Sequence, residues 1–401
     1  MSFVSVYNDL ARGELHQLSQ HATAVDVEAA LSRSGSTRAR LDDFAALVSP
    51  AAGEPQYLEA MAQRAHELTV KHFGRTVRLF APLYLSNECI NVCKYCGFSR
   101  DNPILRVTLS PEQVAAEAKF LRDEGFRHIL LVAGEHPHFI SKNYLRDCVA
   151  QLHPDWPSIS LEVGPLETDE YAPIVQAGAE GLVVYQETYD RAVYDVMHVS
   201  GPKKDFDWRL ETPERAYAAG FKRLGIGALL GLADWRSEAI ALAGHVSYLL
   251  KKCWMAQLTV SVPRLRPAAG EFEPLVNVSD RELARFIMAL RLTFPEVGIV
   301  LSTRESSQLR DGLVPLGITL MSAGSHTEPG GYTGQGKDEL HLTKAGRAVK
   351  PSLPQIESEG EHATVQFQIA DDRSPREVAA KLESMGYEPV WKDWEAVLNE
   401  R

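Results

Sequence analysis

From residue 78 onward, short apolar segments alternate with longer stretches that show helical periodicity. The apolar segments are nearly continuous and rich in β-branched residues, which is typical of parallel strands buried on both faces. The pattern predicts eight strands, at 78–86, 128–134, 158–164, 181–186, 223–230, 257–263, 298–302 and 317–322.

Helix-start signals fall between these segments. Ser110 supplies an N-cap and Pro111 follows it in the first turn, while Thr168, Thr212 and Ser279 precede similar acidic first turns. Strands that alternate with helices in this way predict an α/β fold of the (β/α)8 TIM-barrel type. A doubly wound open sheet satisfies the same alternation and is the alternative architecture.

The segments on either side of the predicted barrel differ from it in pattern. Residues 1–77 predict an N-terminal helical extension, and residues 78–330 predict the barrel. Residues 331–401 are expected to form a C-terminal loop and tail, in which the Gly-, Lys-, Pro-, Ser- and Glu-rich stretch to residue 362 predicts a mobile loop or linker. A last helix is expected over 374–386.

Composition narrows the class of protein. The chain has 401 residues, a formal net charge of −11 and 45% hydrophobic residues. This acidic balance argues against a nucleic-acid-binding surface, and the hydrophobic share excludes wholesale disorder. No apolar run reaches membrane-spanning length, and the N-terminus shows no secretion signal. Since three of the five cysteines are clustered, cysteine usage indicates a reduced compartment, and we expect a cytoplasmic enzyme with a small substrate.

The clustered cysteines, Cys89, Cys93 and Cys96, follow the first predicted strand with the spacing C-x3-C-x2-C. A structural zinc site takes four protein ligands, whereas a 4Fe-4S cubane takes one ligand per iron, so three cysteines leave one iron open. With Tyr95 between the last two cysteines, this is the pattern of radical S-adenosylmethionine (SAM) enzymes. The alternative from a different functional class is a non-catalytic barrel stabilised by zinc, with a distant histidine as the fourth ligand.

Polar residues recur where the predicted strands end, and in a (β/α)8 barrel these ends share one mouth. Gly134 and Glu135 are candidates to receive the methionyl amine of SAM, because glycine allows a ligand to approach closely. An ordinary strand-to-helix turn is the structural alternative for this pair. Glu162, Gln186 and Glu187 are candidates for holding the ribose hydroxyls or the methionyl end.

Basic residues at the same ends suggest carboxylate binding. Arg264, Arg266 and Arg304 offer planar guanidinium groups, and a buried ion pair is the structural alternative for each of them. His136 and His326 are either proton shuttles or hydrogen-bonded structural histidines.

Several longer runs extend beyond these single positions. They are 47–52, 82–87, 95–99, 184–189, 207–213, 261–267, 301–306 and 389–394. Through them the chain resembles the radical SAM tyrosine lyases of thiamine biosynthesis (2-iminoacetate synthases), in the aromatic amino-acid lyase group, over most of its length. The segment 337–362 is longer than is usual in that family.

The resemblance implies that Cys89, Cys93 and Cys96 bind a 4Fe-4S cluster, and that Arg304 binds the substrate carboxylate, with Ser322 at the amino-acid head and Tyr84 beside it. It further implies cofactor-binding roles for Tyr95, Gly134, Glu135, Glu162, Gln186, Glu187, Arg209 and Arg264. The implied reaction cleaves the Cα–Cβ bond of L-tyrosine to 2-iminoacetate and p-cresol, and consumes SAM to 5′-deoxyadenosine and methionine. Thiazole synthase and a flavodoxin-type reductant are the implied partners.

Two relatives share this core. The maturase of iron–iron hydrogenase carries a second cysteine-bound cluster in a C-terminal extension, and this chain has no cysteine after Cys253 to bind one. The tryptophan lyase of thiopeptide synthesis has a different cluster loop and is the alternative within the group.

Overall fold

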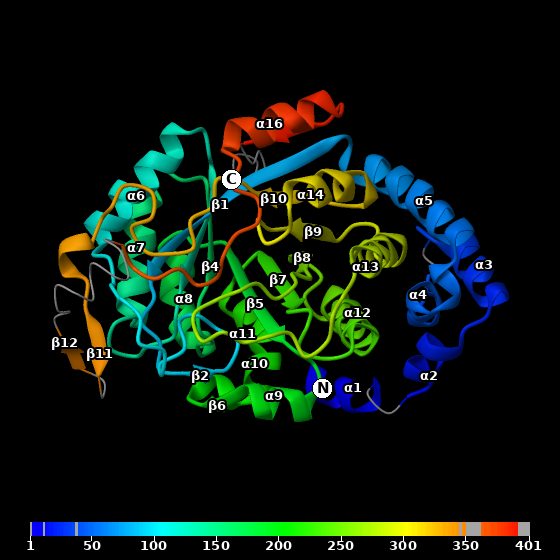
Figure 1. The fold of residues 1–401 in the computed structure, drawn as a ribbon, viewed down its shortest axis with the longest axis horizontal. Coiled ribbons are helices and arrows are strands. Elements are labelled where there is room, and N and C mark those ends of the chain that lie inside the picture. The colour runs from blue at the N-terminus through cyan, green and yellow to red at the C-terminus, as the bar shows by residue number, and fades with distance from the viewer. Residues whose placement is uncertain (1, 11–12, 37–38, 345–346, 350–361, 392–401) are drawn as a thin grey trace.

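The computed structural model describes residues 2–10, 13–36, 39–344, 347–349 and 362–391. At its centre is a closed parallel barrel, as the alternation of strands and helices predicts (Figure 1). Its eight strands are β1 (Thr76–Ser86), β3 (His128–Ala133), β4 (Ser158–Glu162), β5 (Gly181–Glu187), β7 (Arg223–Ala228), β8 (Gln257–Ser261), β9 (Gly298–Leu301) and β10 (Leu320–Ser322).

Closure of the barrel comes from β10, which pairs in parallel with β1 so that Phe80 lies opposite Ser322. The open-sheet alternative is therefore wrong. β13 (Glu388–Val390) pairs with the start of β1 and lies outside the ring. The eighth strand begins at Leu320 and not at residue 317, because Gly317, with φ of 137°, ends the preceding turn.

Helices surround the barrel, and a capping box confirms the helix start predicted at Ser110. The helices between the strands are α6 (Pro111–Asp123), α7 (Lys142–Leu152), α8 (Thr168–Gln176), α9 (Arg191–Met197), α10 (Phe206–Leu210), α11 (Thr212–Ala219), α12 (Trp235–Lys252), α13 (Asp280–Thr293) and α14 (Ser307–Leu313).

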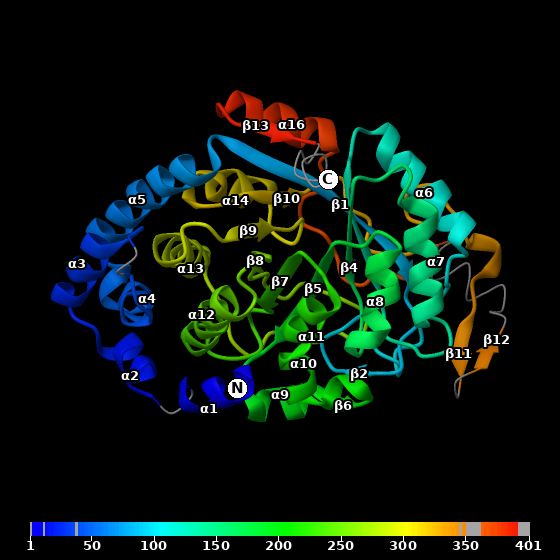
Figure 2. The ribbon, with the colours of Figure 1, turned by 180° about the vertical axis from the view of Figure 1, so that it is seen from behind.

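The N-terminal helices lie along one side of the barrel, where α1 packs on α12, and α4 and α5 pack on α13 (Figures 1 and 2). They are α1 (Phe3–Leu10), α2 (Glu14–His21), α3 (Ala24–Arg33), α4 (Leu41–Val48) and α5 (Pro55–Phe73). Their apolar faces join the core of the barrel in one continuous cluster. No described helix is long and apolar enough to cross a membrane.

The first part of the C-terminal region, for which a mobile loop or linker is predicted, contacts the barrel. The backbone N–H groups of Tyr332 and Thr333 each donate at 2.9 Å to the carboxylate of Glu117 in α6. A hairpin of β11 (Leu342–Lys344) and β12 (Arg347–Val349) follows. Residues 350–361 and 392–394, also subjects of the sequence analysis, lie outside the described residues. The predicted last helix is α16 (Pro375–Ser384).

Residues 363–373, which we call the strap, cross the mouth of the barrel. Backbone N–H groups of the strap donate to carbonyl oxygens of four loops at the carboxyl ends of the strands. These bonds run from Thr364 to Leu105 at 3.0 Å, Gln366 to Thr327 at 2.8 Å, Gln368 to Pro267 at 2.9 Å and Ala370 to Thr303 at 2.8 Å. The strap therefore joins the ends of β1, β8, β9 and β10.

Candidate active site

The cysteine loop leaves β1 and is held by its own polar groups. The buried guanidinium of Arg106 donates to the carbonyl oxygens of Asn87 at 2.6 Å and Ser99 at 2.8 Å. Within the loop, β2 (Val92–Cys93) pairs with β6 (His198–Ser200). A Cβ on Gly97 would lie 2.4 Å from the carbonyl oxygen of Gln366, so glycine is needed where the strap passes the loop.

The three thiols occupy this loop on the mouth side of the barrel. All three are free, Cys93 is buried, and Cys89 and Cys96 are half-buried. No three His, Cys, Asp or Glu side chains in the described chain converge closely enough to hold a single metal ion. A cubane does not require such convergence, because each cysteine binds a different iron at a different corner. The donor set thus fits a 4Fe-4S cluster better than a zinc ion.

Tyr95, within the cysteine loop, is held by a hydrogen bond to His198. The Tyr95 hydroxyl lies 2.8 Å from Nε2 of His198, whose Nδ1 lies 2.8 Å from the carbonyl oxygen of Tyr194. Burial lowers the pKa of His198 to about 3. The imidazole is therefore neutral, donates from Nδ1 and accepts from Tyr95. Tyr95 is thus a buried residue of the cysteine loop whose hydroxyl is fixed by His198.

Gly134 and Glu135 lie where β3 meets the cysteine loop. A Cβ on Gly134 would lie 2.2 Å from the carbonyl oxygen of Glu88, so the two backbones touch here. The Glu135 carbonyl accepts from the Ile90 N–H at 2.8 Å, and its carboxylate accepts from Asn91 Nδ2 at 2.7 Å. Both predicted residues are thus adjacent to the cysteines.

A charged cluster fills the mouth beside β4 and β5. Glu187 accepts from Lys203 Nζ at 2.7 Å and from Arg209 at 3.4 Å, and Arg209 Nε also donates to the carbonyl oxygen of Tyr185 at 2.7 Å. Burial opposes ionisation of Glu187, but Lys203 and Arg209 outweigh it and hold the pKa of Glu187 below its usual range. Burial, together with the charge of Glu187, raises the pKa of Glu162 to about 7. The backbone of Glu187 is left-handed, with φ of 70°.

Arg304 follows β9 and faces the strap. Its Cζ lies 3.4 Å from the centre of the Phe367 ring. Its guanidinium makes no hydrogen bond and no ion pair with any residue that the structure describes, although Glu162 and Glu187 are near enough to favour its charge. Burial nevertheless lowers the pKa of Arg304. A half-buried guanidinium whose donors meet no acceptor among the described residues is a site for an anion.

Tyr84 and Ser322 border the same space. The Tyr84 hydroxyl donates to Oε1 of Gln366 at 2.7 Å, and burial followed by the charge of Glu162 raises the pKa of Tyr84. Ser322 Oγ accepts from the backbone N–H of Thr303 at 3.2 Å.

Arg264 and Gln186 are directed elsewhere, against their predicted roles as SAM ligands. Arg264 Nε donates to Glu305 at 3.0 Å, and NH1 lies 2.8 Å from Asp280, so the ion-pair alternative describes it. Gln186 alternates with the mouth-facing Tyr185 and Glu187 and therefore points outward, where its Nε2 donates to the carbonyl oxygen of Phe206 at 3.3 Å. The guanidinium of Arg264 is thus held in ion pairs, whereas Oε1 of Gln186 is buried without a hydrogen-bond partner among the described residues.

Each of the two candidate histidines, His136 and His326, has a polar contact close to it in the sequence. His136 Nδ1 accepts from the His138 N–H at 3.2 Å, and His326 lies 3.0 Å from Glu328 at the surface. Sequence reasoning missed Lys203, Gln366 and Phe367. Only the charge of Lys203 gave a signal, and it lies in a segment without a strand-end pattern.

Comparisons with known proteins agree with this geometry. Residues 83–242 match the radical SAM superfamily, and residues 261–388 match the Biotin and Thiamin Synthesis associated domain. The chain is 45% identical to 2-iminoacetate synthase of Escherichia coli over 94% of this chain and 92% of that protein. It is 42% identical to 2-iminoacetate synthase of Salmonella typhimurium, with the same coverage.

Among solved structures, the chain is similar to a maturase of the FeFe-hydrogenase, HydG. The TM-score is 0.84 at 28% identity, over 96% of this chain and 80% of that one. HydG from Carboxydothermus hydrogenoformans gives a TM-score of 0.79 at 33% identity, over 97% and 83% of the two chains.

Proposed function

The chain belongs to the 2-iminoacetate synthase family of radical SAM enzymes, and from that membership we propose how the mouth of its barrel binds SAM and tyrosine. It is a radical SAM lyase that cleaves the Cα–Cβ bond of L-tyrosine to 2-iminoacetate and p-cresol. The tryptophan lyase is not favoured by these relatives. When bound, the 4Fe-4S cluster and SAM supply the 5′-deoxyadenosyl radical that starts the reaction.

Cys89, Cys93 and Cys96 are the proposed cluster ligands. Burial raises the pKa of the Cys93 and Cys96 thiols, while the charge of Lys203 lowers it. Lys203 Nζ lies 5.6 Å from the centre of the Tyr95 ring. Its positive charge is therefore close enough to the thiols of Cys93 and Cys96 to stabilise their thiolate forms.

Five residues of the mouth are proposed to hold SAM: Gly134 and Glu135 beside the cysteine loop, and Glu162, Glu187 and Arg209 around it. The close backbone contact at Gly134 brings the end of β3 against the cysteine loop, so an amine at the open iron would meet its carbonyl oxygens. Glu187 and Arg209 hold each other in place through their ion pair. Arg264 is left out of this set because its guanidinium pairs with Glu305, and Gln186 because its Nε2 donates to the carbonyl oxygen of Phe206.

Arg304 carries the proposal for tyrosine. Its guanidinium is half-buried, stacked on Phe367 and without a hydrogen-bond or ion-pair partner among the described residues, and a substrate carboxylate would satisfy its planar donors. Tyr84 and Ser322 border this position and orient the amino-acid head. The strap covers it and excludes water, which protects a radical from side reactions.

Two partners follow from the reaction. 2-Iminoacetate is an imine that water hydrolyses, so transfer to a thiazole synthase is favoured, and the enzyme takes its electron from a flavodoxin-type reductant in the cytoplasm. Failure of the purified enzyme and thiazole synthase to associate anaerobically would argue for free diffusion instead.

The proposed roles are tested by tyrosine binding to the SAM-loaded, unreduced enzyme. Arg304→Ala should weaken tyrosine binding at least tenfold while leaving SAM binding within a factor of two, because a charge-assisted bidentate pair contributes about 1.5–3 kcal/mol. Unchanged tyrosine affinity in Arg304→Ala would show that another group holds the carboxylate. Arg236→Ala is the matched control. Arg236 is a half-buried arginine of α12 that donates to the carbonyl oxygen of Val48.

A further inference from the structure

Asn91 lies between Cys89 and Cys93 and is almost completely buried, with 1% of its surface exposed. Its side-chain amide joins the cysteine loop to two segments that are distant in sequence. Oδ1 accepts from the backbone N–H of Lys203 at 2.9 Å, and Nδ2 donates to Oε2 of Glu135 at 2.7 Å. Nδ2 also donates to Sγ of Cys89 at 3.7 Å. The amide therefore reaches one of the three proposed cluster ligands directly.

The direction of this amide is set by Lys203. A backbone N–H can only donate, so the side-chain oxygen of Asn91 must face Lys203, and the two hydrogens of Nδ2 are directed to Glu135 and Cys89. Because Asn91 is buried, a hydrogen that missed the sulfur would stay unsatisfied, which costs free energy. The geometry therefore commits one N–H group to Cys89.

The chain around Asn91 is shaped to hold the amide in place. Gly201 has φ of 98°, and a Cβ at this position would lie 2.3 Å from Oδ1 of Asn91, so glycine is needed here. The neighbouring residues Val92 and Ser200 pair between β2 and β6. The backbone carbonyl of Asn91 accepts from the N–H of Arg100 at 2.9 Å. Both the backbone and the side chain of Asn91 are thus fixed by the protein.

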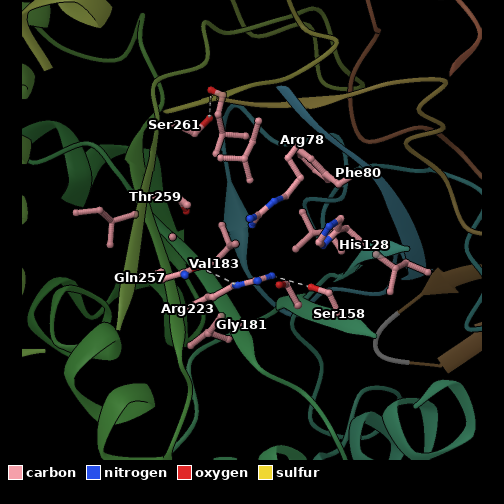
Figure 3. A pocket seen from close by; sticks show the side chains of 18 of the residues that line it. Arg78, Phe80, His128, Ser158, Gly181, Val183, Arg223, Gln257, Thr259 and Ser261 are labelled. Carbon is pink, nitrogen blue, oxygen red and sulfur yellow. Dashed lines mark hydrogen bonds between the residues drawn. The ribbon is translucent and has the colours of Figure 1, made fainter. Parts of the chain in front are cut away.

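Polar bridges of the ordinary kind join oxygen acceptors, as Arg223 does at the opposite end of the barrel. It donates to Oγ of Ser158 at 2.8 Å and to Oε1 of Gln257 at 3.2 Å, and so connects β4, β7 and β8 (Figure 3). Asn91 also connects separate segments, but one of its acceptors is a sulfur. A neutral thiol is a weak acceptor, whereas a thiolate bound to iron carries negative charge. The contact therefore strengthens when Cys89 binds a metal.

A donor beside a cluster ligand affects the reduction potential. Reduction adds one electron to the cluster and its thiolates, so the reduced state is the more negative one and gains more from a nearby N–H group. Phe98 supplies such a donor to Cys96 through its backbone. Asn91 supplies one to Cys89 through a side chain, which a substitution can remove.

We propose that Asn91 is a positioning residue that raises the reduction potential of the cluster through its N–H···S bond to Cys89. The inference rests on the proposed role of Cys89 as a cluster ligand and does not depend on the substrate that the enzyme cleaves. A higher potential favours transfer of one electron from the flavodoxin-type reductant, which is oxidised by one electron in return.

The midpoint potential of the cluster-loaded enzyme tests this proposal. Dithionite reduces the cluster in the presence of low-potential mediators, and EPR of the reduced cluster gives the fraction reduced at each potential. Asn91→Leu, which is similar in size and has no donor, should lower the equilibrium constant for reduction about tenfold, equal to a fall of about 59 mV. Asn91→Ala should shift the midpoint in the same direction.

Asn102→Leu is the matched control. Nδ2 of Asn102 donates to carbonyl oxygens of the same loop, those of Cys96 at 3.1 Å and Gly97 at 3.0 Å. The substitution therefore removes anchoring bonds from the cysteine loop that involve oxygen acceptors, and the midpoint should stay at the wild-type value. A fall equal to that of Asn91→Leu would overturn the proposal, because disturbance of the loop would then be the cause.

Lys203 requires a separate comparison, because Asn91 bonds its backbone and its charge also favours the thiolates. Lys203→Met should lower the midpoint by itself, and Asn91→Leu should lower it further in that background. A double variant with the same midpoint as Lys203→Met would overturn the proposal, since displacement of Lys203 would then account for the whole effect.

The outcomes separate the role of Asn91 from the lyase assignment. A lower midpoint in Asn91→Leu, with four iron and four sulfide bound, supports the proposal even if tyrosine is not cleaved. A wild-type midpoint in both Asn91 variants would overturn the proposal and leave the cluster and the lyase assignment untouched. Failure of both variants to retain four iron, when Asn102→Leu retains it, would overturn it in favour of a role in holding the cluster.

Discussion

The hydroxyl of Tyr84 donates a 2.7 Å hydrogen bond to the side-chain oxygen of Gln366, across 282 residues of sequence. Tyr84 lies near the carboxyl end of β1, and Gln366 lies in the strap. This side-chain bond, together with the backbone bonds of the strap, joins the wall of the mouth to its cover, and the neighbouring strap residue Phe367 stacks on Arg304. Closure of the site thus depends on a segment that belongs to neither the strands nor the cysteine loop.

Gln366→Leu should loosen this cover. Loss of the Tyr84 bond leaves a buried hydroxyl without its acceptor, at a cost of about 1–3 kcal/mol. We expect a five- to tenfold rise in KM for tyrosine and more SAM cleavage without p-cresol, measured as the ratio of 5′-deoxyadenosine to p-cresol. Gln368→Leu is the control. Gln368 also lies in the strap, but it bonds to the carbonyl oxygen of Pro267 through its backbone N–H, which the substitution keeps. Equal ratios in the two variants would contradict a role for the side chain of Gln366.

Asp371 anchors the other end of the strap. Its carboxylate pairs with the fully buried Arg310 and lies 2.7 Å from Arg373. Asp371→Ala leaves the charge of Arg310 buried and unpaired, which should cost about 3–5 kcal/mol of unfolding free energy. Thermal unfolding of the variant should therefore occur well below that of wild type. Asp372→Ala, at the exposed neighbouring position, should unfold with wild type, and a similar loss in both would argue against the buried pair as the cause.

Cys89→Ala should remove the cluster. Three thiolates are the fewest that the proposed site can use, so loss of one should abolish the four-iron absorbance after anaerobic reconstitution, and SAM cleavage with it. Cys148→Ala, in the buried face of α7, should keep four iron and four sulfide per chain. One bound zinc in place of the cluster would support the zinc-stabilised barrel.

Glu238 predicts a pH dependence of stability. It accepts from the Thr188 hydroxyl at 2.5 Å and the Tyr189 N–H at 2.8 Å, and burial raises its pKa from 4.5 to about 7. Because the folded pKa exceeds the unfolded value, the stability from this group is fully present below pH 4.5 and is lost as the pH rises through 7.

Glu238→Gln removes that titration and keeps an acceptor for Tyr189. Between pH 5 and pH 9, wild type should lose about 3 kcal/mol relative to the variant. Thermal unfolding at both pH values, under anaerobic conditions, measures the difference. An equal change in stability for wild type and variant between the two pH values would show that Glu238 is ionised in the folded protein at both.

The barrel could be predicted from the sequence because its signals are local. Strand segments buried on both faces are continuously apolar, and caps such as Ser110 mark the helices between them. The spacing of the three cysteines was enough to predict an iron–sulfur cluster. The strand and helix signals and the cysteine spacing each lie within one element or one loop of the chain.

The rest depended on partners far apart in sequence. Arg264 and Arg304 look alike at two strand ends, yet Glu305 pairs with Arg264, whereas the guanidinium of Arg304 has no ion-pair partner in the described part of the chain. Gln186 points outward because strand residues alternate, a consequence that strand register decides. Gln366 reaches the mouth from a segment without a strand-end pattern, so only the fold brings it to Tyr84.

The central claim is cleavage of tyrosine by this chain, and its products test it most directly. The anaerobically reconstituted, reduced enzyme is incubated with SAM and L-tyrosine, and p-cresol and 5′-deoxyadenosine are quantified. We expect p-cresol to form with tyrosine, in step with 5′-deoxyadenosine, and no product of side-chain cleavage with tryptophan. Absence of p-cresol from an enzyme that carries four iron and cleaves SAM, or cleavage of tryptophan in its place, would contradict the account.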